Sequence, residues 1–313
     1  MGPDHGASNA DRFSRTSGDL LADRRFRYGR DLAEEGDHAA AAHLFAQALE
    51  LVPGWAPGWL ALGDAKARIG DRAAAAEAYG RAAALDDEGV LGASLALASL
   101  AAADPPAAAD RAYVRALFDE YAPRFERHLA ERLAYRGPAL LRAALDRIAP
   151  PPARFGRALD LGCGTGLMGA ALRDRVDWLG GVDLSPAMVA AARAKGIYDA
   201  LTAGDMLDAL AGERLDLAVA ADVLVYVGDL GPTFRAVAAS LGPGGLFAFT
   251  VQSAPEGADV IVGPDRRFAH SRAHILARAG EAGLDVTLCE PASTRRDAGR
   301  DVPGLLAVLR CSP

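Results

Sequence analysis

The sequence predicts an α/β protein with a doubly wound sheet, preceded by an all-α domain. An apolar run that ends in Asp160 leads into a loop with glycine at every second position, Gly162, Gly164 and Gly166. Later apolar runs also end in acids, which is typical of strands whose carboxyl ends form a binding edge. Upstream, a residue pattern recurs after 34 positions, which predicts paired helices.

The repeated pattern lies between residues 28 and 87. Tyr28-Gly29, Gly36-Asp37, Ala41, Phe45, Ala48 and Pro53 recur as Leu62-Gly63, Gly70-Asp71, Ala75, Tyr79, Ala82 and Asp87, each 34 positions later. Small residues let two antiparallel helices pack closely, and each Gly-Asp pair suits the turn between them. The period and the pattern resemble the tetratricopeptide repeat. We therefore expect a tetratricopeptide-repeat domain over residues 22–104.

Two repeats are marginal by themselves, because about three are needed for a stable array. We expect Gly89–Ala103 to add a capping helix, and Trp55 and Trp59, at a repeat boundary, to pack in the core. Residues 1–21 offer few apolar anchors and are expected to be disordered. Asp104-Pro-Pro106 ends the helical array.

A helical extension is expected over residues 110–150, with an interruption near Gly137-Pro138. One of its helical faces carries Phe118, Tyr121, Phe125 and Leu129. This stripe is either ordinary core or a lid over a bound ligand. The hydroxyl of Tyr121 favours the lid, because a core stripe needs no polar tip.

Five apolar runs are expected to form the strands of the sheet. The first ends in Asp160, and the glycine loop and a helix over Leu167–Arg175 follow it. The free amides at the start of that helix favour a polar or anionic ligand group. The remaining runs are Trp178–Val182 before Asp183, a stretch from Ala200 before Asp205, Leu215–Val219 before Asp222, and Leu246–Val251 after the turn Leu241–Gly245. An acid at the end of the second strand binds ribose hydroxyls in doubly wound folds, so this role is expected of Asp183.

Residues 154–310 resemble the class I S-adenosylmethionine-dependent methyltransferases. The matching pieces are the loop Asp160–Gly166, Asp183, Gly204-Asp205-Met206 and the Leu-x-Pro-Gly-Gly turn at 241–245. Phe118-Asp-x-Tyr-Ala122, Arg267-Phe-Ala-His-Ser271 and Val302-Pro-Gly-Leu-Leu306 also resemble a bacterial group of methyltransferases that carry tetratricopeptide repeats. The resemblance implies a Rossmann-like fold and S-adenosylmethionine as cofactor, and it leaves the methyl acceptor unassigned.

The resemblance also implies a set of cofactor contacts. Asp160 and the amides of Gly162, Cys163 and Gly164, next to Gly166, would hold the methionine end; Asp183 would bind the ribose; Leu184 and Met188 would pack near the adenine; Asp205 would accept from the adenine amine, with Met206 against the ring; and Asp222 would face the reaction zone. Tyr121, on the lid, would reach the methionine carboxylate or the acceptor.

Methyl transfer from a sulfonium needs alignment and the exclusion of water, and it needs no covalent nucleophile. Cys163 is therefore expected to be a spacer in the loop. If the acceptor must lose a proton, the candidate bases are His270, Tyr226, Tyr121 and His128, each of which can equally be a packing or solvent-facing residue. His270 and His274 lack a third ligand, so no metal site is expected.

Three other functions fit parts of the pattern. Gly164-Thr-Gly-Leu-Met-Gly169 also fits the dinucleotide fingerprint of nicotinamide enzymes, with Asp183 at a suitable distance. Asp160 argues against that interpretation, because its carboxylate would repel a pyrophosphate. A protein methyltransferase that holds its substrate on the repeats, and a scaffold that binds the cofactor without transfer, remain alternatives.

Composition favours a soluble globular protein of about two domains, with 313 residues, 51% of them hydrophobic and 24% charged. The net charge of -7 disfavours nucleic acid, and Ala221–Tyr226 lacks the Asn/Asp-Pro-Pro-Tyr motif of amine methyltransferases. Three cysteines without metal spacing suit a reducing cytoplasm. The most apolar run, Ala93–Ala103, is too short to span a membrane. The expected partners are a small-molecule acceptor and a protein or carrier that docks on the repeats.

Overall fold

A computed structural model describes residues 16–312 apart from positions 102, 150, 152 and 298. Contacts divide the chain into two compact units. The first runs up to Leu117 and includes Val262–Arg266, and the second comprises Phe118–Ile261 and the residues from Arg267 onward. The boundary thus falls a few residues after 110, where the sequence placed it. Residues 1–21 were expected to be disordered. Residues 1–15 of this segment lie outside the described residues, and the first helix begins at Leu20, before the expected end of the segment.

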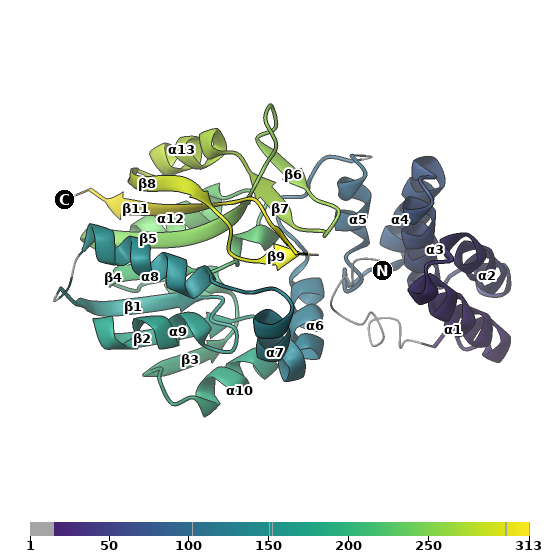
Figure 1. Cartoon of the computed structure of the whole chain (residues 1–313), viewed down its shortest axis with the longest axis horizontal. Coiled ribbons are helices and arrows are strands. Elements are labelled where there is room, and N and C mark those ends of the chain that lie inside the picture. The colour runs from purple at the N-terminus through teal and green to yellow at the C-terminus, as the bar shows by residue number, and fades with distance from the viewer. Residues whose placement is uncertain (1–15, 102, 150, 152, 298, 313) are drawn as a thin grey trace. The chain divides into compact units, whose positions relative to one another are not determined.

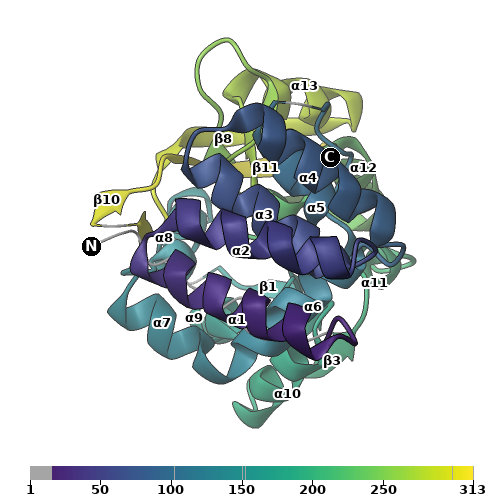
Figure 2. The same cartoon turned by 90° about the vertical axis from the view of Figure 1, so that its right-hand side faces the viewer.

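The first unit consists of helices that follow one another along the chain (Figures 1 and 2). They are α1 (Leu20–Glu35), α2 (His38–Leu51), α3 (Ala56–Arg68), α4 (Arg72–Leu85) and α5 (Ala93–Ser99), followed by the first turns of α6 (Arg111–Tyr121). Each of the first four helices packs against the next. Helix α5 lies within the segment expected to supply a capping helix.

The turns of the two helical pairs confirm the role predicted for the Gly-Asp pairs. Gly36 ends α1 with φ of 91°, and Gly70 follows α3 with φ of 82°; this left-handed region favours glycine. Asp37 then caps α2 by accepting from the amide of Ala40 at 2.9 Å, and Asp71 caps α4 in the same way.

The repeated small residues allow close helix packing. A Cβ on Gly29 would lie 2.7 Å from the Phe45 ring, and a Cβ on Gly63 would overlap the ring of Tyr79. Phe45 and Tyr79 are both buried in the core of this unit, as predicted. Trp55 is also buried there, which confirms its core assignment.

The segment Val262–Arg266 contributes a half-buried charge to the first unit. The Arg266 guanidinium pairs with the carboxylate of Asp64, which also accepts a hydrogen bond from the Tyr79 hydroxyl at 2.8 Å. Arg266 has φ of 58°, a strained value for a residue with a side chain. The ion pair therefore holds a strained residue in place.

The second unit contains the sheet and the helices that cover it (Figure 1). Its helices are the end of α6, α7 (Phe125–Glu131), α8 (Gly137–Ile148), α9 (Leu167–Leu172), α10 (Pro186–Ala194), α11 (Met206–Leu210), α12 (Gly231–Ser240) and α13 (Arg272–Glu281), with 3-10 turns η1 (Ala122–Arg124), η2 (Arg173–Arg175) and η3 (Leu224–Tyr226). Its strands are β1 (Phe155–Leu161), β2 (Val176–Asp183), β3 (Ala200–Ala203), β4 (Leu215–Ala220), β5 (Leu241–Ser253), β6 (Val260–Val262), β7 (Phe268–His270), β8 (Leu284–Ala292), β9 (Arg296–Asp297), β10 (Arg300–Asp301) and β11 (Gly304–Cys311).

The main sheet is Rossmann-like and mixed. Its order is β3-β2-β1-β4-β5-β11-β8, and the first five strands in this order pair in parallel. Strand β11 runs antiparallel to both β5 and β8, which makes the sheet mixed. A short β7 extends beside the end of β5, and β6 pairs with β7.

Alternation along the strands buries both faces of the sheet. On one face, α8 and α9 cover residues such as Leu217, Val219 and Leu246. On the other face, α11, α12 and α13 cover residues such as Phe247 and Phe249. Helices on both faces are what a doubly wound fold requires, and this part of the prediction is confirmed. None of the described helices has the length and apolar character needed to cross a membrane.

Three element boundaries differ from the sequence prediction. Gly137 and Pro138 begin α8 rather than interrupting a helix, because proline suits the first turn, and the interruption lies just before them. The helix predicted over Leu167–Arg175 ends its α-helical part at Leu172 and finishes as a 3-10 turn. The Leu241–Gly245 turn is continuous with β5, although Gly244 keeps a φ of 77°.

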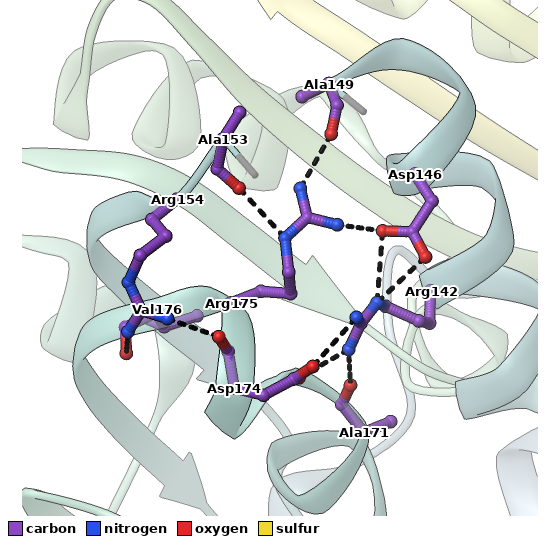
Figure 3. Close-up of polar contacts among 9 residues, drawn as sticks. All are labelled: Arg142, Asp146, Ala149, Ala153, Arg154, Ala171, Asp174, Arg175 and Val176. Atoms are coloured by element: carbon purple, nitrogen blue, oxygen red, sulfur yellow. Dashed lines mark hydrogen bonds and ion pairs between the residues drawn. The ribbon is translucent and has the colours of Figure 1, made fainter. Parts of the chain in front are cut away.

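A polar network fastens α8 to the turn η2 that precedes β2 (Figure 3). Arg175, only 4% exposed, pairs with Asp146 and donates to the carbonyl oxygens of Ala149 at 2.6 Å and Ala153 at 2.9 Å. Arg142 bridges Asp146 and Asp174. Nothing in the sequence pattern indicated this network. A buried guanidinium must be paired, so Asp146 is expected to be important for stability.

Candidate functional site

Four acids lie at the edge formed by the carboxyl ends of the parallel strands. Asp160 is the second-last residue of β1, Asp183 ends β2, Asp205 follows β3 and Asp222 follows β4. These four strands are neighbours in the sheet and run in parallel, so their carboxyl ends share one edge. Such an edge is the usual ligand-binding position of doubly wound folds.

The glycine loop after β1 has the backbone that its sequence predicts. Gly162, Gly164 and Gly166 have φ of 66°, 52° and 90°, all in the left-handed region. A Cβ on Gly162 would lie 2.5 Å from a methyl group of Val223, whereas the nearest atom to a Cβ on Gly164 would be Cε1 of Phe125 at 3.9 Å. The loop is thus closely packed at Gly162 and open at Gly164.

Two amides of this loop are engaged within the protein. The Cys163 amide donates to the carbonyl of Val182 at 2.9 Å, and the Gly164 amide donates to Oδ2 of Asp183 at 2.9 Å. These bonds leave the expected role of the two amides as cofactor donors without support. Cys163 is buried, and burial raises the pKa of its thiol, which suits a spacer rather than a nucleophile.

Asp160 has one satisfied and one unsatisfied carboxylate oxygen. Its Oδ2 accepts from the Tyr198 hydroxyl at 2.6 Å, and its Oδ1 has no hydrogen-bond partner among the described residues. Burial raises the pKa of Asp160 to about 7; the Tyr198 hydrogen bond opposes the rise, and the Asp183 charge adds to it. A buried carboxylate with a free oxygen fits a cationic ligand group.

Tyr198 is a site residue that the sequence analysis missed. It lies between α10 and β3, and its ring packs where three glycines leave room, since a Cβ on Gly166, Gly169 or Gly181 would come within 3.0 Å of it. The glycines at 169 and 181 were therefore a signal for a large side chain above them. The Tyr198 hydroxyl holds Asp160 in place.

Asp183 ties two loops together at the end of β2. Its Oδ1 accepts from the Ser185 amide at 2.8 Å, and its Oδ2 accepts from Gly164. Burial raises the pKa of Asp183. The Ser185 hydroxyl in turn donates to Asp119 at 2.5 Å, at the end of α6. Asp119, part of the Phe-Asp-x-Tyr-Ala phrase, thereby positions the loop that holds Asp183.

The residues expected around an adenine differ in their placement. Met188 is fully buried, so its side chain offers no surface to a ligand in this conformation. Leu184 is half-buried beside Asp183, and Met206 is half-buried against the core. Asp205 caps α11 by accepting from the Leu207 amide at 2.8 Å.

Asp222 adopts a strained backbone at the end of β4. Its φ is 58°. Its Oδ1 accepts from Thr250 and its Oδ2 from Thr294, each at 2.8 Å, and the Arg295 guanidinium lies 3.7 Å from Oδ2. Strain of this kind persists where surrounding contacts hold it, and it is common at functional sites.

The stripe of α6 and α7 contributes aromatic rings to the same unit. Tyr121 is 8% exposed, and its ring packs edge-on against Phe125 with centroids 5.1 Å apart. Its hydroxyl contacts Nδ1 of His128. Phe118 packs edge-on against Tyr226 at 5.6 Å. The structure thus brings two candidate bases, Tyr121 and His128, into direct contact.

Comparison with known proteins assigns the family. A family described as "Methyltransferase domain" matches residues 127–292. The ubiquinone biosynthesis O-methyltransferase of Methylobacterium sp. (strain 4-46) is 32% identical over 199 residues, which cover 54% of this chain and 78% of that protein. The chain belongs to this methyltransferase family. This confirms the enzyme class predicted from the resemblance, an S-adenosylmethionine-dependent methyltransferase.

Other relatives of the methyltransferase share shorter regions or the fold alone. The malonyl-[acyl-carrier protein] O-methyltransferase of Enterobacter lignolyticus (strain SCF1) is 32% identical over 146 residues, 46% of this chain and 55% of that protein. The 1,6-didemethyltoxoflavin-N1-methyltransferase of Burkholderia thailandensis, solved with S-adenosylhomocysteine, matches with a TM-score of 0.52 and 18% identity over 67% of this chain and 94% of that one.

The surroundings of His270 do not suit a general base in this methyltransferase. It is fully buried, its Nε2 lies 2.9 Å from the carbonyl oxygen of Val227, and its ring stacks on His274. Burial lowers the pKa of His270 to about 4, and the neighbouring His274 adds to this effect. The structure therefore favours a packing role for His270. Tyr226, 9% exposed, accepts from Arg267 at 3.3 Å.

Proposed function

We propose that the protein transfers the methyl group of S-adenosylmethionine to an oxygen of a small-molecule acceptor, which a carrier can present. The observation that carries the proposal is the buried Asp160, whose free Oδ1 lies beside the glycine loop. Two relatives named above are O-methyltransferases, and one of them has a carrier-bound substrate in its name. These names support an oxygen acceptor.

The cofactor supplies a methyl group already activated on sulfonium, and the chain supplies binding, orientation and a dry site. Asp160 accepts from the methionine ammonium through Oδ1. Asp183 accepts from the ribose hydroxyls with the lone pairs that Gly164 and Ser185 leave, and Asp205 accepts from the adenine amine. Asp222 lies nearest the acceptor. The open position at Gly164 lets the ligand approach the backbone.

The α6–α7 stripe serves as a lid in this proposal. Asp119 fastens it to Ser185, and Lys195 pairs with Glu126 at 2.5 Å, so both ends of α10 hold it. The Tyr121–His128 pair is the candidate proton acceptor for a hydroxyl substrate. The Tyr121 phenol is hydrogen-bonded to the His128 imidazole. As the acceptor oxygen becomes methylated, the phenol oxygen takes the proton of the acceptor hydroxyl, and the phenol's own proton passes to the imidazole.

Turnover is the direct test of the proposed function. Protein supplied with S-adenosylmethionine labelled in its methyl group and with pools of small metabolites is expected to release S-adenosylhomocysteine and labelled product.

Tyr121→Phe should slow transfer at least about tenfold, because general bases contribute roughly 10²–10⁴-fold. Its melting temperature should change little, since the ring packing stays. Equal turnover in both proteins would remove Tyr121 from the mechanism, and no release with any pool would contradict transfer.

Binding of the cofactor product is expected to depend on pH through Asp160. Its pKa of about 7 lies above the ordinary 3.8, so the free protein carries a proton on it below neutrality. An ammonium requires the carboxylate, and affinity for S-adenosylhomocysteine should fall up to about tenfold per pH unit below 7. Tyr198→Phe removes a hydrogen bond that lowers this pKa, so its affinity profile should shift to higher pH. Calorimetry between pH 5.5 and 8.5 measures both profiles, and identical profiles would exclude Asp160 as the ammonium acceptor.

The protonation of Asp160 makes folding stability and ligand affinity change in opposite directions with pH. Because the folded-state pKa of Asp160 is raised, the folded protein binds more protons than the unfolded chain between about pH 3.8 and 7. The contribution of Asp160 to stability is therefore largest below this window. It is lost as the pH rises through 7, while affinity for the ammonium group increases over the same range.

We further propose that the first unit is a tetratricopeptide-repeat module that docks a protein or a carrier. The matching helix pairs, the repeated Gly-Asp turns and the equivalent burial of Phe45 and Tyr79 support this.

A cytoplasmic location is proposed because the three cysteines are free. A protein methyltransferase and an inactive scaffold are the less favoured alternatives, since the two relatives named above are O-methyltransferases of ubiquinone biosynthesis and of malonyl-[acyl-carrier protein].

A further inference from the structure

Helix α1 buries one face and exposes the opposite one. It begins the row of helices in the first unit and packs against α2 (Figures 1 and 2). Its buried residues are Ala22, Phe26 and Gly29. Because an α-helix turns by about 100° per residue, a stripe of other side chains points away from these. This exposed stripe, which we call the outer face of α1, consists of Leu20, Arg24, Arg27, Tyr28, Asp31 and Glu35.

Two large apolar side chains of the outer face extend into solvent. Leu20 is 88% exposed and Tyr28 is 60% exposed, the two highest values among the large hydrophobic side chains of the described residues. A hollow in the surface of α1 is lined by Arg24, Arg27, Tyr28, Arg30 and Asp31. Tyrosine and arginine are among the residues that most often anchor one protein on another. The composition of the outer face is therefore that of an interaction surface.

The charges of the outer face change sign along the helix. Arg24 and Arg27 lie in the N-terminal half of α1, and Asp31 and Glu35 lie in the C-terminal half. The last turn of α1 carries no basic residue, although the helix dipole favours a cation there. The stability of the helix itself therefore does not explain this order of charges, whereas contact with a second charged surface does.

A basic half and an acidic half make the outer face complementary to itself. Two such helices side by side in parallel would set arginine against arginine and acid against acid, which is unfavourable. Antiparallel helices set each basic half against the acidic half of the other, and a two-fold axis through the middle of the pair relates them. A separate protein of one charge would be attracted by one half of the face and repelled by the other. A second copy of this chain satisfies both halves at once.

Full overlap of the two antiparallel helices fixes which side chains meet. Helix α1 runs Leu20–Glu35, so the first residue of one copy lies opposite the last residue of the other. In this register Arg24, the fifth residue, faces Asp31, the fifth from the end. Arg27 likewise faces the ring of Tyr28, and a guanidinium over an aromatic ring is favourable. Each contact occurs twice, because the axis repeats it.

We propose that the outer face of α1 binds the same face of a second copy of this chain, with the two helices antiparallel about a two-fold axis. The proposed methyl transfer does not depend on this dimer. The contact joins the helical pairs of both copies in one longer array. This meets the requirement that a stable array contain about three repeats, which the two pairs of a single copy do not reach.

Sedimentation equilibrium of the full chain at increasing concentration tests the dimer. The wild-type protein is expected to shift from the mass of one chain toward the mass of two. A contact between two single helices is small, so we expect a dissociation constant of about 1–100 μM. High salt should weaken the dimer, because it screens exposed charges. A protein that stays monomeric up to about 500 μM, well above this range, would overturn the inference.

Two charge variants test the pairing of the copies. Arg24→Glu sets two acids against each other, and Asp31→Arg sets two arginines against each other, so each variant alone should dimerise about tenfold or more weakly. An equimolar mixture should recover the wild-type affinity, because each new charge then faces an opposite charge in the other copy. Arg68→Glu, at an exposed arginine that ends α3, makes the same change elsewhere and should leave the dimer intact.

Melting temperatures show whether the variants fold. Arg24→Glu and Asp31→Arg each bring charge of the sign that the helix dipole favours toward the nearer end of α1, so neither should lower the melting temperature by much. Tyr28→Ala, which changes no charge, should also weaken the dimer about tenfold or more, and it decides the question if a charge variant does not fold. A dimer that survives all three substitutions, or a mixture of the two charge variants that dimerises as weakly as each alone, would overturn the inference.

Discussion

Asp146→Ala is expected to lower the free energy of unfolding by about 3 kcal/mol, at the lower end of the range for a buried ion pair, because the Asp146 side chain is 32% exposed. The reason is Arg175, whose side chain is only 5% exposed. Without Asp146, the guanidinium would keep the carbonyl oxygens of Ala149 and Ala153 but no carboxylate of its own (Figure 3). Arg142 would also lose one of its two carboxylate partners. Urea denaturation of both proteins measures the difference.

A surface pair in the same region provides the control for this prediction. Arg154 and Asp177 lie 2.8 Å apart with side chains 46% and 64% exposed. Because water screens such a pair, Asp177→Ala should cost less than about 1 kcal/mol. Arg175→Met together with Asp146→Leu removes both charges and should recover much of the loss. Equal effects of Asp146→Ala and Asp177→Ala would show that the buried network contributes no special stability.

Asp183→Ala is expected to weaken binding of S-adenosylhomocysteine by about tenfold to a hundredfold, which corresponds to roughly 1.5–3 kcal/mol for hydrogen bonds to a charged acceptor. The change removes the proposed acceptor of the ribose hydroxyls. It also leaves the amides of Gly164 and Ser185 without their partner, so the glycine loop loses its connection to the end of β2. Calorimetry gives the affinity, and thermal melting reports the loosened loop.

A conservative variant separates the two effects of this substitution. Asp183→Asn keeps one acceptor oxygen, so it should preserve more of the melting temperature than Asp183→Ala while still losing affinity. Asp208→Ala, at an exposed acid of α11 away from the strand end, should change neither property. Wild-type affinity in Asp183→Ala would show that the acid at the end of β2 holds the loop only.

Local patterns were enough to predict the parallel strands and the glycine loop. The left-handed glycines 162, 164 and 166 and the capping residues Asp37 and Asp71 are dictated by neighbours a few positions away, and a sequence displays such relations directly. The pattern also predicted that acids would lie at the strand ends, because the period of a strand and its end can be recognised from apolar runs.

Contacts between distant residues escaped the sequence analysis. Tyr198 and Asp160 are 38 positions apart, Asp119 and Ser185 are 66 apart, and Asp146 and Arg175 are 29 apart. Each pair forms only after the sheet and its helices have assembled. The choice between a base and a packing residue at His270 could not be made for the same reason, since burial by elements far along the chain decides whether a histidine can exchange protons.

We propose that the acids at this sheet edge bind S-adenosylmethionine. Isothermal titration calorimetry of the wild-type protein with S-adenosylhomocysteine, and separately with NAD, tests it most directly. We expect one-to-one binding of S-adenosylhomocysteine, which weakens below pH 7, and no heat of binding from NAD. Binding of NAD without binding of S-adenosylhomocysteine would show that this edge is a dinucleotide site, as the fingerprint at Gly164–Gly169 alternatively suggests.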